Sequence, residues 1–600
     1  MAGIFGLLDF SGRTDIRAAA EKLRAAAKQN FGFPSAIREF RNGAIGFAFP
    51  NHYSDTKWPL NSADGKLSLV VFGEIFLPNG EPVRSHNFET GLLEPYLREG
   101  KAFLQKLDGA FIFALMSEEI CVVVNDASGN FGLHYSTGEG HFAFSTQMMS
   151  LLPFTSEQGF DERGLFEHLA ISQSLDGRTS MRSVQRLPRG SILTYSREGA
   201  KLEEYISREF HPSADVKTEL IIVYDALAHS VVQSARHERT TAALTGGFDS
   251  RMTWSLVMKC HRESSVAAET FGLPGSRDMR LSKHIANTLH LTRDAIDIDT
   301  DVLQQLPVLW REFASVTEGL YPISQVHAHY ALRVLGEKYS VLIDSYGGAL
   351  YRRQIKKFVE PRIRFDKELA PQVLPFELTA LVTSTLIRPD VRETMKAIAL
   401  QGLREYYARI EDVPEIGDKF DLYYADQTVA LRDAFSANHQ MNFIGLSQPL
   451  MNATALAAVR RIHGKIRRRE GIHTYIIHRA YPKLETFSLD YSGYVAPYRG
   501  FSTLRLVAPG FDRMLRAASR ILPALKNTSL RKPPMDARSI LEPGLALAKD
   551  LLLTPHPSYD PLIDRAAIER TLHLMEAGDY SSASAIIQLL TFRLFLDVFV

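Results

Sequence analysis

The stretch TAALTGGFDSRMTW, residues 241–254, brings two glycines, a carboxylate and a hydroxyl to the start of an apolar helical pattern. Gly246 and Gly247 follow a β-prone run, and glycines there allow backbone N–H groups to approach an anion closely. A helix N-terminus adds about half a positive charge. Ser250 can donate a hydrogen bond, and Asp249 can hold a Mg²⁺ ion that bridges phosphate oxygens. These residues predict a pyrophosphate site, although an ordinary capped turn between a strand and a helix has the same composition.

Strand and helix patterns alternate after this stretch. Apolar segments at residues 264–272, 294–299 and 338–348 are separated by helical patterns. The alternation predicts a parallel sheet with helices on both faces, in which ligands collect at the carboxyl ends of the strands. Beyond residue 355 nearly all of the sequence has a helical pattern, so we expect a large helical C-terminal part.

The first third of the chain has a different rhythm. It consists of short alternating segments broken by glycines, with helical patterns at about 15–29 and 89–106. These features predict an α+β domain with stacked sheets. A polar segment that contains a proline follows, so we expect a first domain at 1–206, a linker at 207–219 and a second domain at 220–600.

The composition is that of an ordinary globular protein, with 45% hydrophobic and 23% charged residues and a formal net charge of +1. This charge balance predicts no nucleic-acid or membrane partner, and the basic run at 460–470 lacks the interleaved aromatic residues of a nucleic-acid site. The two cysteines, Cys121 and Cys260, exclude a disulfide framework. Neither a signal peptide nor an apolar run of the ~20 residues that span a bilayer is found. We therefore expect a cytoplasmic enzyme of two or more domains.

Residues 244–250, LTGGFDS, resemble the SGGxDS pyrophosphate loop of the N-type ATP pyrophosphatases. Seven further segments resemble, in the same order, segments of the asparagine synthetase family: MAGIFGLLD at 1–9, FGEIF at 72–76, LDGAFIFAL at 107–115, NDASGNFGLHY at 125–135, residues 272–291, VLIDSYGGALY at 341–351 and QPLMN at 448–452. The resemblance implies an N-terminal-nucleophile-hydrolase-like sandwich domain of the glutaminase type. It further implies an α/β ATP-pyrophosphatase domain, similar to adenine nucleotide α-hydrolases, that adenylates a carboxylate.

Two departures from the family pattern fall in the glutaminase-like domain. Ala2 stands where the family has its nucleophilic cysteine, and Phe72 stands where the family has an oxyanion-stabilising asparagine. A methyl group cannot attack an amide, and loss of one oxyanion donor alone costs about 10²–10³-fold in rate. We therefore expect an inactive glutaminase domain, as in the β-lactam synthetases and lasso-peptide cyclases, which this chain also resembles.

The resemblance also implies a nucleotide and metal site. Ala349 falls where the family has its second Mg²⁺ carboxylate, so Asp344 is the candidate replacement, beside Asp249 as the first metal ligand. The implied ATP-binding residues lie at the carboxyl ends of three expected strands: Leu244, Thr245, Gly246, Gly247, Asp249, Ser250, Phe271, Ser345 and Gly347.

For catalysis, the resemblance points to Tyr346, which takes the place of the family's glutamate base. A tyrosine stands there in the β-lactam synthetases, and it can relay a proton if a carboxylate orients it. Glu377 is the expected partner by spacing alone. Lys483 is the expected phosphate-neutralising cation, with Arg479 and Arg499 as alternatives.

Together these features predict an ATP- and Mg²⁺-dependent amide ligase that activates a carboxylate and closes it with an amine. The preferred version is a macrolactam or lasso-peptide cyclase that acts on a peptide or amino-acid-derived substrate, with a leader peptidase or precursor-recognition protein as a partner. Three alternatives stay open: closure of a small β-lactam-type ring, an ammonia-dependent asparagine synthetase, and a non-catalytic scaffold or binding relative.

Overall fold

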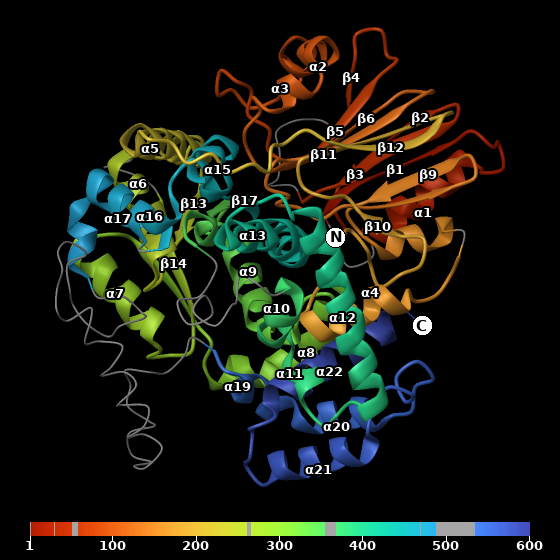
Figure 1. Cartoon of the computed structure of the whole chain (residues 1–600), viewed down its shortest axis with the longest axis vertical. Helices are drawn as coiled ribbons and strands as arrows, with labels where there is room; N and C mark the ends of the chain where they lie inside the picture. The colour runs from red at the N-terminus through yellow and green to blue at the C-terminus, as the bar shows by residue number, and fades with distance from the viewer. Residues whose placement is uncertain are drawn as a thin grey trace.

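The computed structural model describes residues 2–28, 31–50, 58–155, 157–260, 266–353, 368–468, 470–487 and 535–599. Layered strands from the N-terminal third lie at one end of the molecule, red to yellow in Figure 1. A second, helix-rich part, coloured yellow-green to blue, encloses a separate sheet (Figure 1).

The N-terminal part contains two antiparallel sheets of six strands each, as the alternating pattern predicts. Strands such as β1 and β6 are buried along their whole length because they lie between layers. The first sheet has the order β10-β8-β9-β1-β3-β2, with β1 (Gly3–Asp9), β2 (Ser35–Phe40), β3 (Gly43–Ala48), β8 (His134–Gly138), β9 (His141–Ser145) and β10 (Gln185–Arg186). The second has the order β12-β11-β7-β6-β5-β4, with β4 (Leu60–Asn61), β5 (Ser68–Gly73), β6 (Phe111–Met116), β7 (Cys121–Asn125), β11 (Ser191–Ser196) and β12 (Gly199–Glu204).

Helices cover this sandwich. Helix α1 (Ile16–Lys28) lies close to the range expected from the sequence. The second expected helix is divided into η1 (Phe88–Leu93), α2 (Glu94–Glu99) and α3 (Lys101–Leu104). Gly100 interrupts it with a φ of 57°, a left-handed conformation that ends a right-handed helix. The short 3-10 helix η2 (Met149–Phe154) and α4 (Glu162–Ile171) complete this part.

The second part contains a five-stranded parallel sheet, as the strand–helix alternation predicts. Its order is β15-β14-β13-β16-β17, with β13 (Thr240–Ala243), β14 (Ala267–Gly272), β15 (Arg293–Asp297), β16 (Val341–Ile343) and β17 (Gly445–Ser447). The chain runs outward from β13 to one edge and then returns to β16 on the other side. The crevice between β13 and β16 is therefore the switch point at which ligands bind in sheets of this kind.

Connecting helices flank the sheet: α5 (Val216–Ser234), α6 (Phe248–Cys260), α7 (Arg277–Leu289), α8 (Thr300–Val316), η3 (Ile323–Gln325) and α9 (Val326–Lys338). Helix α5 begins inside the expected linker, where the side chain of Asp215 caps it by accepting a hydrogen bond from Thr218 N.

The C-terminal region is helical, as expected. The elements between β16 and β17 are η4 (Gly348–Tyr351), α10 (Leu369–Glu377), α11 (Ala380–Thr383), α12 (Pro389–Arg409), α13 (Ile416–Tyr423), the π-helix η6 (Tyr424–Asp433) and α14 (Ala434–Gln440). Those after β17 are η7 (Pro449–Met451), α15 (Ala453–Arg460), α16 (Gly464–Arg468), α17 (Gly471–Ala480), η8 (Pro482–Thr486), α19 (Ala537–Leu541), η10 (Glu542–Gly544), α20 (Leu545–Leu553), α21 (Arg565–Glu576) and α22 (Ala583–Phe599). None of the described helices combines the length and apolarity needed to cross a membrane.

Several contacts between the two parts involve α12 and η6. Helix α12 packs against α4 of the N-terminal part (Figure 1). Arg189 reaches across to Asp426 of η6, with 2.6 Å between Nε and Oδ1. Arg186 donates to the carbonyl of Ala430 over 2.8 Å and lies over the ring of Phe435 at 4.2 Å. These buried contacts hold η6 in place from the N-terminal side.

A buried carboxyl, Glu318, forms another bridge between the parts. It accepts hydrogen bonds from the backbone N–H groups of Met148 and Met149, at 3.0 and 2.7 Å. Burial raises the pKa of Glu318 to about 7, although the backbone donors of Met149 and Met148 oppose the shift.

The stability of the protein should therefore fall between pH 5 and 7 through Glu318. Its pKa in the folded state lies above the ordinary value of 4.5, so the unfolded chain loses the proton first. The stability that Glu318 contributes is complete below about pH 4.5 and is lost as the pH rises towards about 7. We expect the unfolding free energy of wild type, relative to Glu318→Gln, to fall by about 2 kcal/mol from pH 5 to pH 7 in urea titrations.

The exposed Glu569 provides the control, because Glu569→Gln should differ from wild type by the same amount at both pH values. If the difference in unfolding free energy between wild type and Glu318→Gln stays constant with pH, the raised pKa of Glu318 is refuted.

Candidate functional site

The loop after β13 begins from a fixed strand end. Leu244 donates from its backbone N to Glu269 O over 2.8 Å and accepts at its own carbonyl from Thr270 Oγ1 over 2.7 Å. Both contacts come from β14, the neighbouring parallel strand. They hold the start of the predicted pyrophosphate loop at the carboxyl edge of the sheet.

Short hydrogen bonds fold the loop itself. Gly247 N donates to Thr245 Oγ1 over 3.2 Å, and the hydroxyl oxygens of Thr245 and Ser250 lie 3.0 Å apart. Gly246 N donates to Asp278 Oδ1 over 2.8 Å. Asp278 lies in the first turn of α7, where Ser276 takes the N-cap position. An anionic oxygen therefore lies on a loop amide, which is the kind of contact that the glycines were expected to offer to phosphate.

Asp249, in the first turn of α6, contacts two basic side chains. Its Oδ2 accepts from Arg352 Nη2 and its Oδ1 from His473 Nε2, both at 2.9 Å. Burial of the carboxyl opposes ionisation, but His473 and Arg352 outweigh it and lower the pKa of Asp249. Gly348 packs directly on this carboxylate, since a Cβ built there would lie 2.3 Å from Asp249 Cγ. The structure thus brings the loop after β13 against the loop after β16.

Asp344 follows β16 immediately. Its carboxylate accepts from Tyr346 N at 3.2 Å and from Gln448 Nε2 at 3.4 Å, while burial raises its pKa. Burial and the charge of Asp344 raise the pKa of Glu269 to about 8, so two carboxyl groups lie near each other at this edge. Glu269 was not expected as a site residue, because it lies inside a strand whose neighbours are apolar.

The donors fit a phosphate-bound magnesium ion better than a metal held by protein alone. Among the described residues, no three His, Cys, Asp or Glu side chains form a metal-binding group. Mg²⁺ commonly uses one or two carboxylates together with substrate phosphates. The buried Ser345 Oγ and Glu269 Oε2 have no hydrogen-bond partner in the described structure. Both atoms can therefore form hydrogen bonds with a ligand at the same edge of the sheet. Gly347, with a φ of 92°, turns the chain between these groups and Gly348.

Tyr346 is paired with a carboxylate, but not with the expected one. Its hydroxyl donates to Asp433 Oδ2 over 2.8 Å, and Arg432 Nε donates to Asp433 Oδ1 over the same distance. Burial and the charge of Asp433 raise the pKa of Tyr346 well above 10, so the phenol is neutral near pH 7. Glu377, expected as the partner, ends α10 and acts instead on the pKa of Tyr407.

Asp433 could not have been identified from spacing. It lies 87 residues after Tyr346, at the end of the π-helix η6. Pi-helical segments are rare and occur often at functional sites, but no sequence pattern marked this one.

The remaining expected site residues have other surroundings. Phe271, the last residue but one of β14, is half-buried, with its ring 5.8 Å from that of His327. Lys483 is exposed on η8, and Arg479 lies over the ring of Tyr224 at 4.6 Å. Arg499 lies outside the described residues. Arg352 and His473 are the basic groups that the structure brings to Asp249, and the sequence analysis gave His473 no role.

The position of the family's cysteine is closed by apolar packing. Ala2 is 1% exposed, and its N–H donates to Asn442 Oδ1 over 2.6 Å. Phe72 is fully buried, with its ring 4.7 Å from that of Phe131 and 6.1 Å from that of Phe49. Cys121 lies inside β7, where burial raises the pKa of its thiol. Ala2, Phe72 and Phe131 belong to the same buried apolar cluster.

Comparisons with known proteins match part of the chain. No curated protein matches the sequence significantly. Among solved structures, the chain is similar to a glutamine phosphoribosylpyrophosphate amidotransferase from B. subtilis, complexed with ADP and GMP, at 13% identity and a TM-score of 0.24. It is also similar to a structure described as the allosteric regulatory enzyme of purine biosynthesis, at 14% identity and the same TM-score. Each alignment covers 49% of this chain and less than two thirds of the other, 65% and 64% respectively.

A protein-family comparison is more specific. Residues 1–206 match the family described as a glutamine amidotransferase domain. The matched range ends two residues after β12, the last strand of the sandwich in the sequence. The N-terminal part of the chain is therefore an α+β sandwich that matches the glutamine amidotransferase domain family.

Proposed function

We propose that this protein is an ATP-dependent amide ligase, which adenylates a carboxylate and joins it to an amine with release of pyrophosphate and AMP. The observation that carries the proposal is the convergence of Asp249, Asp344 and the Tyr346–Asp433 pair at the carboxyl edge of one parallel sheet. The contact between Gly348 and Asp249 joins the two loops that bear these groups. In this proposal the second part is an ATP-pyrophosphatase-like synthetase domain.

The loop between β13 and α6 is suited to the phosphates of ATP. Its Gly246 amide already binds an anionic oxygen from Asp278, at the N-terminal end of a 13-residue helix. Arg352 stands beside it and can turn its guanidinium from Asp249 to a phosphate. Asp249 would hold a bound Mg²⁺ ion, with Asp344 as the second candidate ligand, and the ion would neutralise phosphate charge.

The Tyr346–Asp433 pair supplies a route for the proton of the attacking amine. In the proposed step the amine nitrogen forms a bond to the activated acyl carbon, and the bond from that carbon to the AMP oxygen breaks. The nitrogen then loses a proton to the phenol oxygen of Tyr346, as the phenol proton passes to Asp433 over the 2.8 Å hydrogen bond. A neutral, buried phenol that donates to a carboxylate is arranged for such a relay.

The amine must come from the substrate rather than from glutamine. Ala2 carries no nucleophile, and it lies buried in the same apolar cluster as Phe72 and Phe131. An amine within the same molecule as the acid meets the requirement, and its proximity is worth up to about 7–11 kcal/mol in well-oriented cases. Macrolactam or lasso-peptide closure is the version that we favour, with a small-ring closure as the alternative within the same chemistry.

A non-catalytic scaffold is the second candidate, and a specific observation favours it. The loop amides of Gly246 and Gly247 both have partners within the protein, and both oxygens of Asp249 are bound by basic side chains. A loop that never binds ATP would be stable in this state. Pyrophosphate exchange separates the two functions, because a scaffold catalyses none.

The first prediction concerns Asp249. Wild type should exchange labelled pyrophosphate into ATP when peptides with a free carboxylate are supplied with magnesium, and Asp249→Asn should lower this exchange at least 100-fold because the metal ligand loses its charge. Gly348→Ala should lower it as well, since the new Cβ forces the Asp249 carboxylate aside. Gly32→Ala is the matched control, because a Cβ there has open space. Full pyrophosphate exchange by the Asp249→Asn variant would refute the assignment of Asp249 as a metal ligand.

A second prediction separates adenylation from amine capture. Tyr346→Phe keeps the ring but removes the proton relay, so pyrophosphate exchange should persist while amide formation falls about 10²–10⁴-fold. Asp433→Asn should give the same pattern, whereas Glu377→Gln should leave amide formation near wild type. Product is followed by mass spectrometry of the dehydrated substrate. Equal loss of exchange and product in Tyr346→Phe would show that the tyrosine acts before amine capture.

A third prediction concerns glutamine. The wild-type protein should release no glutamate from glutamine, and Ala2→Cys alone should not restore hydrolysis, because Phe72 offers no oxyanion donor where the family has asparagine. Coupled glutamate detection measures this directly. Glutamate release by the Ala2→Cys variant would mean that a donor other than residue 72 serves the site.

A further inference from the structure

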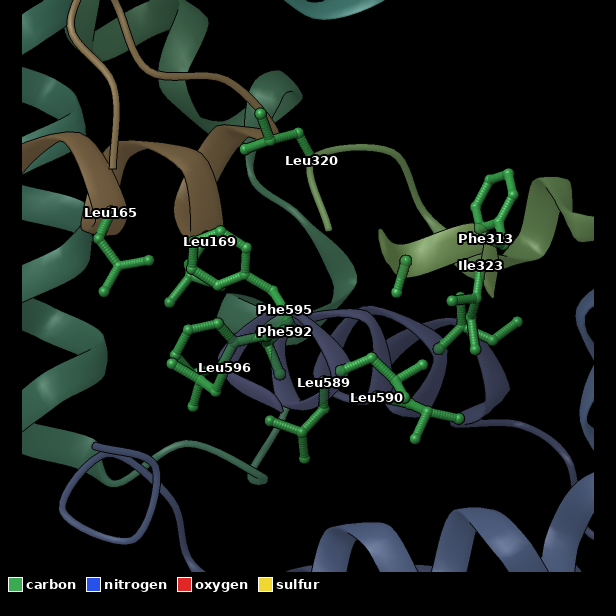
Figure 2. Packing of buried hydrophobic residues seen from close by; sticks show 14 of the residues in the cluster. Leu165, Leu169, Phe313, Leu320, Ile323, Leu589, Leu590, Phe592, Phe595 and Leu596 are labelled. Carbon is green, nitrogen blue, oxygen red and sulfur yellow. The ribbon is translucent and has the colours of Figure 1, made fainter. Parts of the chain in front are cut away.

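A cavity of about 290 Å³ lies between the two parts of the protein, beside the Tyr346–Asp433 pair. Its walls come from α4, α11, α22 and the segment that precedes η3. Figure 2 shows Leu165 and Leu169 of α4 facing α22, from which Phe592 and Phe595 project. This volume is close to the lower end of the ~300–1,000 Å³ typical of ligand pockets.

The walls are mostly apolar and carry little charge. Leu320 and Leu381 add to the leucine and phenylalanine side chains that line it. His168 also lines the cavity, and burial lowers the pKa of its imidazole to about 4, so it is uncharged near pH 7. The walls therefore suit an aliphatic or aromatic group of the size of one large side chain.

One end of the cavity is charged. Arg432 and Asp433 line it there, and Asp433 is the same carboxylate that accepts the hydrogen bond from Tyr346. Its side chain is 16% exposed, and Arg432 engages mainly Oδ1. A carboxylate has about four acceptor positions, so Asp433 retains capacity for another donor. A partly desolvated carboxylate with spare acceptor positions attracts a cation that brings N–H groups.

We propose that this cavity binds the apolar group of a primary amine and holds its amino group at Asp433. The assignment deepens the proposed ligase function, on which its catalytic meaning rests, by naming the class of the nucleophilic substrate. An amine held at Asp433 lies next to the hydroxyl of Tyr346, which takes up its proton in the proposed relay. The N-terminal residue of a peptide, with a leucine- or phenylalanine-like side chain, has this chemistry.

Ser180 provides a way to fill the cavity without touching the catalytic pair. It lines the cavity, is almost fully buried, and its Oγ has no hydrogen-bond partner in the described structure. Ser180→Leu places a branched side chain into the space, and Ser180→Ala removes the hydroxyl without filling it. Comparison of these two variants separates the effect of filling the cavity from the effect of losing the hydroxyl.

The test uses phenethylamine and 3-phenylpropionate, which share an aromatic group and differ in the sign of their charge. Binding to the full chain without ATP is measured by ligand-observed NMR titration. Phenethylamine should bind wild type and Ser180→Ala alike, at least tenfold more weakly to Ser180→Leu, and more weakly to Asp433→Asn. The carboxylate should bind wild type more weakly than the amine.

Two results would overturn the proposal. Equal or tighter binding of 3-phenylpropionate would assign the cavity to another kind of substrate, and unchanged binding of phenethylamine to Ser180→Leu would place the amine elsewhere. The comparison of the two probes on wild type needs no variant, so it stands even if Ser180→Leu does not fold. The binding measurement contains no nucleotide, so its result is independent of the pyrophosphate-exchange assay. A failed amine-binding test would not contradict the proposed ligase function, and absent exchange would not contradict amine binding in the cavity.

Discussion

The carboxylate of Asp433 is the contact on which the arrangement of the site depends. It accepts from Tyr346 on the edge of the parallel sheet and from Arg432 beside the cavity, so one group links sheet, cavity and helix. Its position is set by η6, whose other end is held by the pairing of Asp426 with Arg189 of the N-terminal domain. A ten-residue π-helix has less favourable backbone geometry than an α-helix and persists where its surroundings hold it in place. The buried interface between the two parts provides those surroundings.

This dependence gives the N-terminal domain a role that needs no glutaminase chemistry. Arg186 and Arg189 reach from it to the backbone and side chains of η6, and α4 supplies one wall of the cavity. In its core, Phe72 packs on Phe131, and both rings are buried. Aromatic packing stabilises a sandwich core more than an unused pocket would. In the proposed ligase, the domain therefore contributes through the surface that it presents to η6 and to the cavity.

Patterns close together in the chain predicted much of the fold. Alternating segments marked the strands of the sandwich, and the run that ends before Gly246 marked β13 at the centre of the parallel sheet. Glycine explains one difference, because Gly100 breaks an apparently continuous helical pattern through its positive φ. The three-residue strand β17 escaped notice since its pairing with β16 depends on tertiary contacts rather than on periodicity.

The candidate site was less predictable, because its decisive contacts join distant residues. Asp249 and Tyr346 lie in segments with recognisable spacing, but their partners do not. His473 is 224 residues from Asp249, and Asp433 is 87 residues from Tyr346. A single sequence shows which side chains can ionise, but the partner of each is set by how helices pack. Glu377 was chosen by spacing alone, and packing brought Asp433 to Tyr346 instead.

The charges around the loop after β13 also suggest how binding and chemistry are coupled in the proposed reaction. In the structure Asp249 accepts hydrogen bonds from Arg352 and His473, and the amide of Gly246 donates to Asp278. Phosphate oxygens compete with Asp278 for that amide and with Asp249 for Arg352, so nucleotide entry releases carboxylates as it occupies their partners. A released Asp249 is then free for a cation that arrives with the phosphates. Because Gly348 leaves no space behind Asp249, the carboxylate cannot retreat towards β16, and the exchange of partners must proceed on the open side of the loop.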